Sequence, residues 1–194
     1  MKVLAFAATS SSKSINKQLV KYATSLINSA AHEIEIIDLN DFEMPLFSED
    51  KEAEVGVPEA AHAFFNKITA SDAIVISFAE HNGSYTVAYK NIFDWASRIS
   101  MQVFQGKPMV MLATSPGPGG AASVLKGAAD SSVYFNGKVV GTLSVPSFYD
   151  NFDAATGVVK EEALATELSN LMQQLADAAD SASAIADETN TVTA

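Results

Sequence analysis

The sequence contains no cysteine, which excludes disulfides, thiolate metal sites and cysteine nucleophiles. It is also poor in basic residues, because 12 Lys and Arg stand against 23 Asp and Glu, for a formal net charge of −11. This charge repels nucleic-acid backbones, so no DNA or RNA partner is expected. No apolar run approaches the roughly 20 residues of a membrane span, and a strand explains the short apolar N-terminal run better than a signal peptide does. We therefore expect a cytoplasmic protein without a membrane partner.

Hydrophobic residues make up 48% of the 194 residues, as in globular proteins, and the length fits a single domain. Apolar segments alternate along the chain with segments of helical periodicity. This alternation predicts an α/β fold, with a parallel sheet covered by helices on both faces. The expected strands are residues 3–7, 33–39 (an edge strand), 73–78, 109–114 and 138–145. The expected helices are residues 15–27, 58–70, 86–99, 121–132 and 163–175, and residues 40–56 are expected to form a loop.

The first loop, between the first strand and the first helix, is a run of hydroxyl side chains from Thr9 to Ser14 that includes Lys13. The first turn of a helix has backbone N–H groups without internal partners, and the helix dipole favours an anion there. We therefore expect this loop to hold the phosphate of a mononucleotide. The alternative is that these Ser and Thr residues only cap the helix.

Two further polar loops, residues 79–84 and 115–120, follow the third and fourth strands. In a parallel sheet these loops are neighbours of the first loop, and ligands bind at this edge. Their glycines allow the backbone to approach a flat ligand closely, although a simple turn is the alternative. His81 is a candidate base, but a lone histidine in a turn usually has no such role. No spacing typical of a Ser-His-Asp set or a metal site stands out, so we expect neither catalytic side chains nor a metal.

With these loops, the sequence resembles the NAD(P)H-dependent FMN reductase family over roughly residues 1–175. The first loop, AATSSSKSINKQL, is similar to that family's phosphate loop, in which Gly-Ser is followed by polar residues and Ser-x-Asn. The second, AEHNGSY, is similar to its Pro-Glu-Tyr-Asn segment, and the third, SPGPGG, resembles its Ser-x-Gly-x-Gly-Gly. The segment KNIFDW resembles the family's Lys-Asn-x-x-Asp-Trp and is interpreted as structural or as part of a subunit interface. The chain departs from the pattern at Ala8, Ser11, Ala79 and His81, where Gly, Arg, Pro and Tyr are usual.

The resemblance implies a flavodoxin-like three-layer sandwich, whose five-stranded parallel sheet has the order 2-1-3-4-5. It further implies bound FMN, NADPH or NADH as electron donor, a flavin, quinone or similar small molecule as acceptor, and a homodimer or homotetramer. The composition of residues 177–194, mostly Ala, Ser, Thr and Asp with little apolar content, predicts a polar, flexible tail after a domain of residues 1–176. The side chains near Phe93 and Trp95, or residues 44–47, would form either subunit contacts or ordinary core. The cofactor-binding residues implied are Thr9, Ser11, Ser14, Asn16, Ala79, Glu80, His81, Asn82, Gly83, Ser115, Gly117, Gly119 and Gly120.

Two other functions remain open at this point. The first is a flavodoxin-like electron carrier that holds FMN without oxidising NAD(P)H itself, for which the acidic charge would suit a basic redox partner. The second is a binding protein that has lost the flavin, a reading that Ser11 in place of the usual Arg keeps open.

Overall fold

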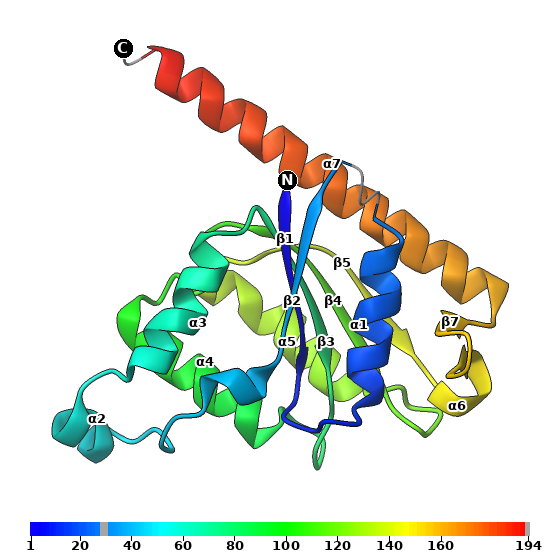
Figure 1. The fold of residues 1–194 in the computed structure, drawn as a ribbon, viewed down its shortest axis with the longest axis horizontal. Coiled ribbons are helices and arrows are strands. Elements are labelled where there is room, and N and C mark those ends of the chain that lie inside the picture. Colours follow the sequence, from blue (N-terminus) through cyan, green and yellow to red (C-terminus); the bar gives the residue numbers. More distant parts are fainter. Residues whose placement is uncertain (28–30, 193–194) are drawn as a thin grey trace.

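The central sheet carries the fold of this protein, described here from a computed structural model of residues 1–27 and 31–192 (Figure 1). Its five strands are parallel and lie in the order β2-β1-β3-β4-β5, as predicted. Each strand begins and ends within two residues of its predicted bounds, because the apolar runs that mark the strands are sharply delimited. The strands are β1 (Lys2–Ala8), β2 (Glu33–Ile37), β3 (Ala73–Phe78), β4 (Pro108–Thr114) and β5 (Lys138–Val145).

Helices cover both faces of the sheet, which gives the predicted three layers (Figure 1). One face is covered by α1 (Ile15–Ser25), α6 (Phe148–Asn151) and α7 (Glu162–Val192). The opposite face is covered by α3 (Glu59–Thr69), α4 (Val87–Ile99) and α5 (Ala122–Ser132). The short elements are α2 (Glu49–Val55), the 3-10 helices η1 (Leu39–Phe42) and η2 (Val133–Phe135), and an antiparallel pair of β6 (Phe152–Asp153) and β7 (Val158–Val159).

Each face of the sheet has its own hydrophobic core. Strands β3 and β4 are buried along their whole length, and their side chains alternate between the two cores. Phe78 and Met111 belong to the core under α3, α4 and α5, whereas Val75 and Leu112 belong to the core under α1 and α7. This two-sided burial explains why the strands read as continuous apolar runs instead of alternating ones.

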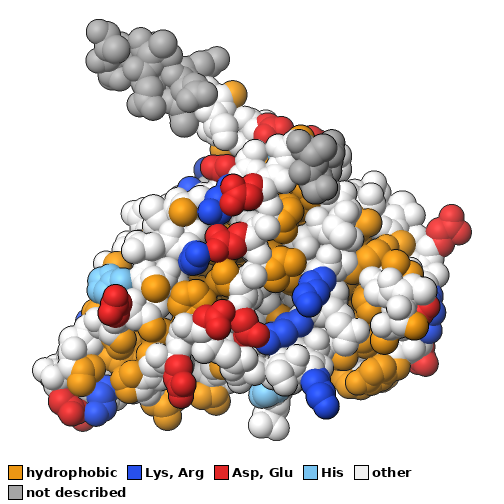
Figure 2. Space-filling view, viewed as in Figure 1, with side chains coloured by type: hydrophobic (Ala, Val, Ile, Leu, Met, Phe, Trp, Pro, Cys, Tyr) orange, Lys and Arg blue, Asp and Glu red, His pale blue; other side chains and the backbone are white. Residues whose placement is uncertain are grey.

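Strand β2 is the edge strand next to β1, as its alternating sequence predicts. Charged side chains surround it: Lys2 Nζ lies 3.4 Å from Glu35 and 3.6 Å from Glu33, and Lys67 Nζ lies 2.5 Å from Glu35. The hydrogen bond from Lys67 lowers the pKa of Glu35, although partial burial opposes the shift. Figure 2 shows acidic and basic side chains close together along this strand. Such charges keep an exposed edge from pairing with another chain.

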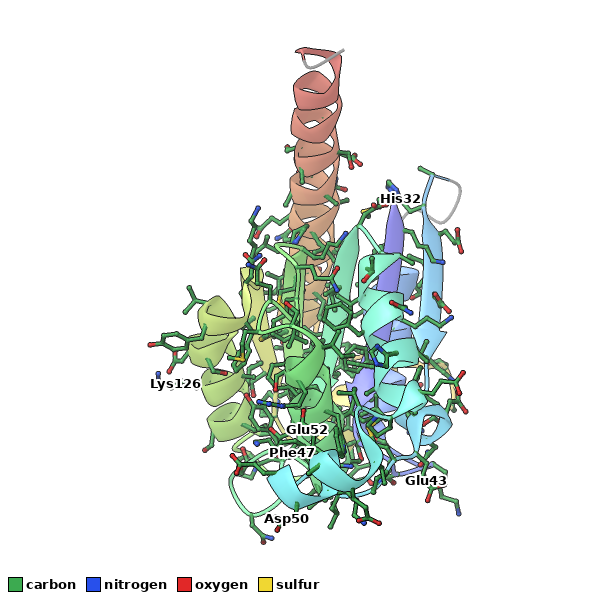
Figure 3. The ribbon with its side chains drawn as sticks, turned by 90° about the vertical axis from the view of Figure 1, so that its left-hand side faces the viewer. His32, Glu43, Phe47, Asp50, Glu52 and Lys126 are labelled. Atoms are coloured by element: carbon green, nitrogen blue, oxygen red, sulfur yellow. The ribbon has the colours of Figure 1, made fainter. Side chains whose placement is uncertain are left out.

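The prediction of a loop over residues 40–56 is wrong in part, because η1 and α2 form within it. Ser48 caps α2 by accepting a hydrogen bond from the Lys51 N–H, and acidic residues fill the first turn, both of which are helix-start signals. Glu52 of this helix is paired with Arg98 of α4 at 3.0 Å. Figure 3 shows Phe47, Asp50 and Glu52 gathered at this end of the molecule.

Helix α7 is longer than predicted, since it continues from Glu162 without a break to Val192, although a tail was expected from residue 177. Alanine, the best helix former, is frequent in this segment, and Ala176 and Ala179 are buried. The end of the helix projects beyond the sheet (Figure 1). Whether residues 177–192 are flexible stays a prediction, and residues 193–194 lie outside the described residues. No helix in the described part of the chain is long and apolar enough to cross a membrane.

Candidate functional site

The loops that follow β1, β3 and β4 line one cavity of about 260 Å³ at the carboxyl edge of the sheet. The structure thus brings together parts of all three predicted segments, which lie far apart in the sequence. Tyr149 of α6 completes the wall, and no pattern in the sequence had pointed to it. Of the residues expected to bind a cofactor, those that line the cavity are Thr9, Ser11, Ser14, Asn16, Ala79, Glu80, His81 and Ser115.

The first loop presents two largely buried hydroxyls at the N-terminus of α1. Ser14 is the N-cap, and its Oγ accepts a hydrogen bond of 3.1 Å from the Asn16 N–H. Thr9 Oγ1 accepts one of 3.2 Å from the Ser11 N–H. Because each hydroxyl is used here only as an acceptor, its own proton remains available for a bound anion. Capping and anion binding are therefore compatible, and the two interpretations of this loop do not exclude each other.

Lys13 is the cation that lines the cavity. No carboxylate pairs with it within residues 1–27 and 31–192. Lys17, one turn into α1, is in contrast engaged by Asp38. Burial would raise the pKa of Asp38, but hydrogen bonds from Lys17 and Asn40 outweigh it and lower the pKa below its usual value. The positive charge at the mouth of the cavity therefore comes from Lys13 and from the start of α1.

The Asn16 side chain connects α1 to the sheet, and the expectation that this residue binds a cofactor stays a prediction. Its Oδ1 accepts hydrogen bonds from the Thr114 N–H at 3.1 Å and from the Ser77 hydroxyl at 2.7 Å. Its Nδ2 donates to the Thr114 carbonyl at 3.2 Å, and the residue is only 2% exposed. The side chain therefore ties α1 to β3 and β4, and holds the first loop against the sheet edge.

The second loop is a tight hairpin that starts at His81. The His81 and Ser84 backbones exchange two hydrogen bonds, of 3.0 and 3.1 Å. Between them Asn82 and Gly83 have φ angles of 54° and 77°, as the Asn-Gly pair favours in a two-residue turn. Asn82 and Gly83 form the exposed tip and do not line the cavity. The hairpin thus presents its base to the cavity, while its tip stands in solvent.

Glu80 links the second loop to the helix that follows the third. Its carboxylate accepts a hydrogen bond of 3.0 Å from the Val124 N–H in the first turn of α5. The residue at the N-cap position, Ala121, provides no side-chain cap of its own. A negative charge at this place stabilises the helix dipole. Glu80 is therefore a helix cap supplied from a neighbouring loop, a role that its place in the motif did not reveal.

The third loop is fixed by its glycines and by α6. The Gly117 carbonyl accepts a hydrogen bond of 2.9 Å from the Ser147 N–H, and the Ser115 carbonyl accepts one of 3.0 Å from the Phe148 N–H. Gly120 has a φ of 57°, and a Cβ added there would lie 2.2 Å from Ser144 Oγ. At Gly117 and Gly119 an added Cβ would meet nothing within 4 Å. None of the three predicted glycines of this loop, Gly117, Gly119 and Gly120, is among the residues that line the cavity.

Gly120→Ala is expected to lower the free energy of unfolding by about 2 kcal/mol, because a Cβ is strained at this φ and collides with Ser144. Gly119→Ala in the same loop has open space, so we expect a change below about 0.5 kcal/mol. Urea unfolding of the two variants beside the parent protein measures the difference. Equal stability of the two variants would contradict the geometry of this loop.

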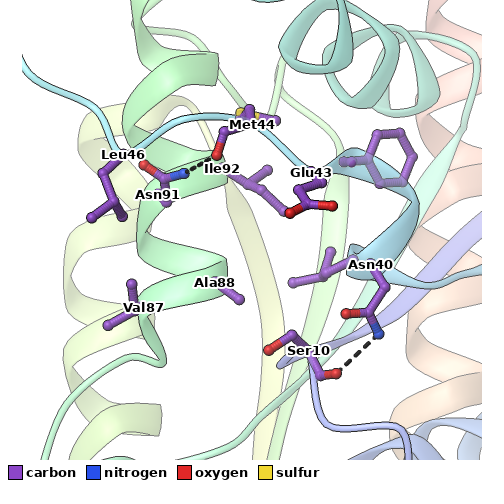
Figure 4. A pocket seen from close by; sticks show the side chains of 11 residues that line it. Ser10, Asn40, Glu43, Met44, Leu46, Val87, Ala88, Asn91 and Ile92 are labelled. Carbon is purple, nitrogen blue, oxygen red and sulfur yellow. Dashed lines mark hydrogen bonds between the residues drawn. The ribbon is translucent and has the colours of Figure 1, made fainter. Parts of the chain in front are cut away.

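A second cavity, of about 450 Å³, lies beside the first loop, between η1 and the start of α4 (Figure 4). Leu46 and Val87 stand on its wall with exposed fractions of 69% and 67%. The Asn91 side chain fixes the segment above it by hydrogen bonds to the Phe47 N–H and the Pro45 carbonyl. Trp95, in contrast, is fully buried and donates a hydrogen bond of 2.7 Å to Pro45. Trp95 is therefore core, and the exposed apolar surface in this region belongs to Leu46 and Val87.

Comparison with known proteins identifies relatives of two kinds. The family model described as NADPH-dependent FMN reductase matches residues 1–150. An NAD(P)H-dependent FMN reductase of Pseudomonas aeruginosa is 36% identical over 122 residues, which cover 63% of this chain and 64% of the relative. A 2-hydroxy-1,4-benzoquinone reductase of a Burkholderia species is 36% identical over 110 residues, covering 56% and 57%. The matches thus span less than two thirds of the length of these relatives.

Among solved structures, the flavoenzyme NAD(P)H:(acceptor) oxidoreductase of Paracoccus denitrificans superposes with a TM-score of 0.72 at 25% identity. The superposition covers 93% of this chain and 97% of that one.

Proposed function

The chain belongs to the NADPH-dependent FMN reductase family, and from this premise we propose that it oxidises NADPH or NADH with bound FMN and reduces a flavin, a quinone or a similar small acceptor. The observation that carries the proposal is the convergence of three loops on one cavity at the N-terminus of α1. The two relatives described above support the same reaction, since they are an FMN reductase and a quinone reductase.

The residues of the first loop fit a phosphate. Thr9 and Ser14 have hydroxyl protons to donate, the first turn of α1 has unpaired N–H groups, and Lys13 supplies a positive charge. A helix N-terminus of this kind favours an anion. We therefore expect the FMN phosphate to be held by Thr9, Ser11, Ser14 and Lys13. Lys13 would supply the positive charge of the Arg that is usual in the family at the position of Ser11.

The other two loops fit a planar ring. The base of the hairpin at residues 79–81 and Ser115 of the third loop line the cavity and would hold it, with the uncrowded backbone of Gly117 and Gly119 next to them in sequence. These loops are fixed before any ligand arrives, by Glu80 on α5 and by the contacts of Ser115 with α6. Backbone donors that are fixed in advance oppose a developing negative charge without reorganising. Bound FMN would supply the redox chemistry, so no side chain needs to serve as acid, base or nucleophile.

A homodimer or homotetramer is part of the proposal. The exposed Leu46 and Val87, at the rim of the 450 Å³ cavity, form an apolar patch that a second copy would cover. The proposal also includes a cytoplasmic location, because NADPH and NADH are available there. Sedimentation of the parent protein and of Val87→Glu tests the assembly, because a charge at this patch would dissociate copies that meet there.

The function is tested by mixing the purified protein with FMN, NADPH or NADH, and a quinone, and by following the absorbance of the nicotinamide. Rapid oxidation that requires both FMN and acceptor is the expected result. An FMN-containing protein that leaves the nicotinamide intact would instead be an electron carrier, whose net charge of −11 suits a basic partner. If the purified protein does not bind added FMN, as judged by its absorbance spectrum, it is neither a reductase of this kind nor an FMN electron carrier.

A further inference from the structure

A third cavity, of about 220 Å³, lies between α4 and α5 and shares no lining residue with the two cavities described above. Its wall is largely aromatic. Phe93 lies 4.7 Å from Phe135 and 5.5 Å from Phe104, and Tyr85 lies 5.2 Å from Tyr89, all between ring centroids. These five rings form a cage that opens on the helix face away from α1 and α7.

The cavity contains a buried hydroxyl without a partner. Tyr89 is 3% exposed, and no hydrogen bond to its hydroxyl forms anywhere in residues 1–27 and 31–192. Its hydroxyl oxygen is nevertheless not sealed from solvent, since Gln105 Nε2 is the only fully buried, unpaired side-chain atom of these residues. Tyr89 is one of the residues that line this cavity, which gives a ligand access to its side chain. A ligand oxygen at this place would replace water as the hydrogen-bond partner of the hydroxyl.

The remaining polar groups lie around this hydroxyl or at the rim. The Tyr85 hydroxyl lies 3.3 Å from Ser131 Oγ, and Ser97 Oγ is already used by the Asp94 carbonyl. Lys90 and Asp94 neutralise each other at 2.6 Å. Burial, with the nearby Tyr85, raises the pKa of Tyr89 well above its usual value, so its hydroxyl stays neutral. The interior is thus uncharged and largely apolar, and the Tyr89 hydroxyl is free to form a hydrogen bond with a ligand.

We propose that this cavity binds a small, neutral, planar aromatic molecule with a single hydroxyl group, of the phenol and naphthol class. The volume is below the roughly 300 Å³ at which sites for drug-sized ligands begin, so one or two fused rings fit. Aromatic rings at these separations favour edge-to-face contacts with a further ring. The ligand hydroxyl pairs with that of Tyr89. A charged ligand is disfavoured, because no free charge lines the interior to offset its desolvation.

The test is calorimetric titration of the FMN-loaded and FMN-free protein with 2-naphthol, and with naphthalene as the analogue without oxygen. We expect one 2-naphthol per chain in both forms, since the cavity shares no residue with the loops proposed to hold FMN. Tyr89→Phe should lower the affinity for 2-naphthol about fivefold, which is the effect of one neutral hydrogen bond, and should leave the affinity for naphthalene unchanged.

Ala128→Leu, which fills the cavity from α5, should abolish binding. Ala163→Leu, the same change at an exposed position of α7, should not affect it. Should Ala128→Leu fail to fold, Ser131→Leu fills the cavity from the half-exposed side. The proposal is overturned if the parent protein does not bind 2-naphthol, if the filled variants bind it as the parent does, or if 2-naphthol binds only while it dissociates an oligomer.

Discussion

Replacing Ser14 with aspartate is expected to weaken FMN binding by about 100- to 1,000-fold. Two like charges about 4 Å apart repel by about 4 kcal/mol at the effective dielectric of a protein surface, and each 1.4 kcal/mol is tenfold in affinity. Aspartate is as good an N-cap as serine, so the hydrogen bond to the Asn16 N–H and the start of α1 should be retained. The variant therefore changes the charge at the site and leaves the helix intact.

The measurement is quenching of flavin fluorescence during titration of the FMN-free protein. Riboflavin, which lacks the phosphate, is the matched ligand, and its affinity should be nearly the same for the parent and for Ser14→Asp. Ser14→Asn is the matched variant, because it keeps a capping side chain without a charge. The phosphate does not lie at the start of α1 if Ser14→Asp binds FMN as tightly as the parent protein does. The same conclusion follows if the substitution lowers the affinity for riboflavin as much as the affinity for FMN.

Asn16→Ala is expected to destabilise the fold by about 3 kcal/mol, because the Thr114 N–H, the Thr114 carbonyl and the Ser77 hydroxyl would each lose a buried partner. For a chain of this size, such a loss lowers the melting temperature by about 10 °C. Urea unfolding gives the change in free energy, and an unchanged m-value shows that the unfolded state is comparable.

The second variant needed is Ser77→Ala, alone and combined with Asn16→Ala. Because these side chains share a hydrogen bond of 2.7 Å, the double variant should lose less stability than the sum of the two single variants. Additive losses, or a loss below about 1 kcal/mol for Asn16→Ala, would show that the bridge between α1, β3 and β4 contributes little.

The central strands β1, β3 and β4 were predictable because they are buried on both faces. Residues 73–78 were delimited correctly from their apolar run alone, whereas the strand order came from the resemblance to a known family. The polar loops were predicted at the ends of the correct strands, and most of the predicted residues do line one cavity. Their assignment to FMN remains a prediction, which the Ser14 variants test.

The roles of single side chains were not predictable, because they depend on partners far away in the sequence. Asn16 reaches Thr114 across 98 residues, and Glu80 reaches Val124 across 44. A motif identifies the residue type at a position, but it does not say whether the side chain faces the ligand or the scaffold. Tyr149 was missed because a single exposed tyrosine has no periodicity or spacing to mark it. Helix α2, in contrast, carried a capping signal at Ser48 that the apolar residues before it obscured.

Because α7 packs on the sheet, the end of the hydrophobic core does not coincide with the end of the match to the family model. The match to the family model ends at residue 150, yet Leu168, Leu171, Met172 and Leu175 are buried beyond it. Leu171 sits over Gly141 of β5 so closely that a Cβ there would lie 2.2 Å from it. A fragment that ends at residue 150 would lack α7 and would expose one side of β4 and β5 to water. The part of the chain that the family model matches is therefore shorter than the part that packs into one core.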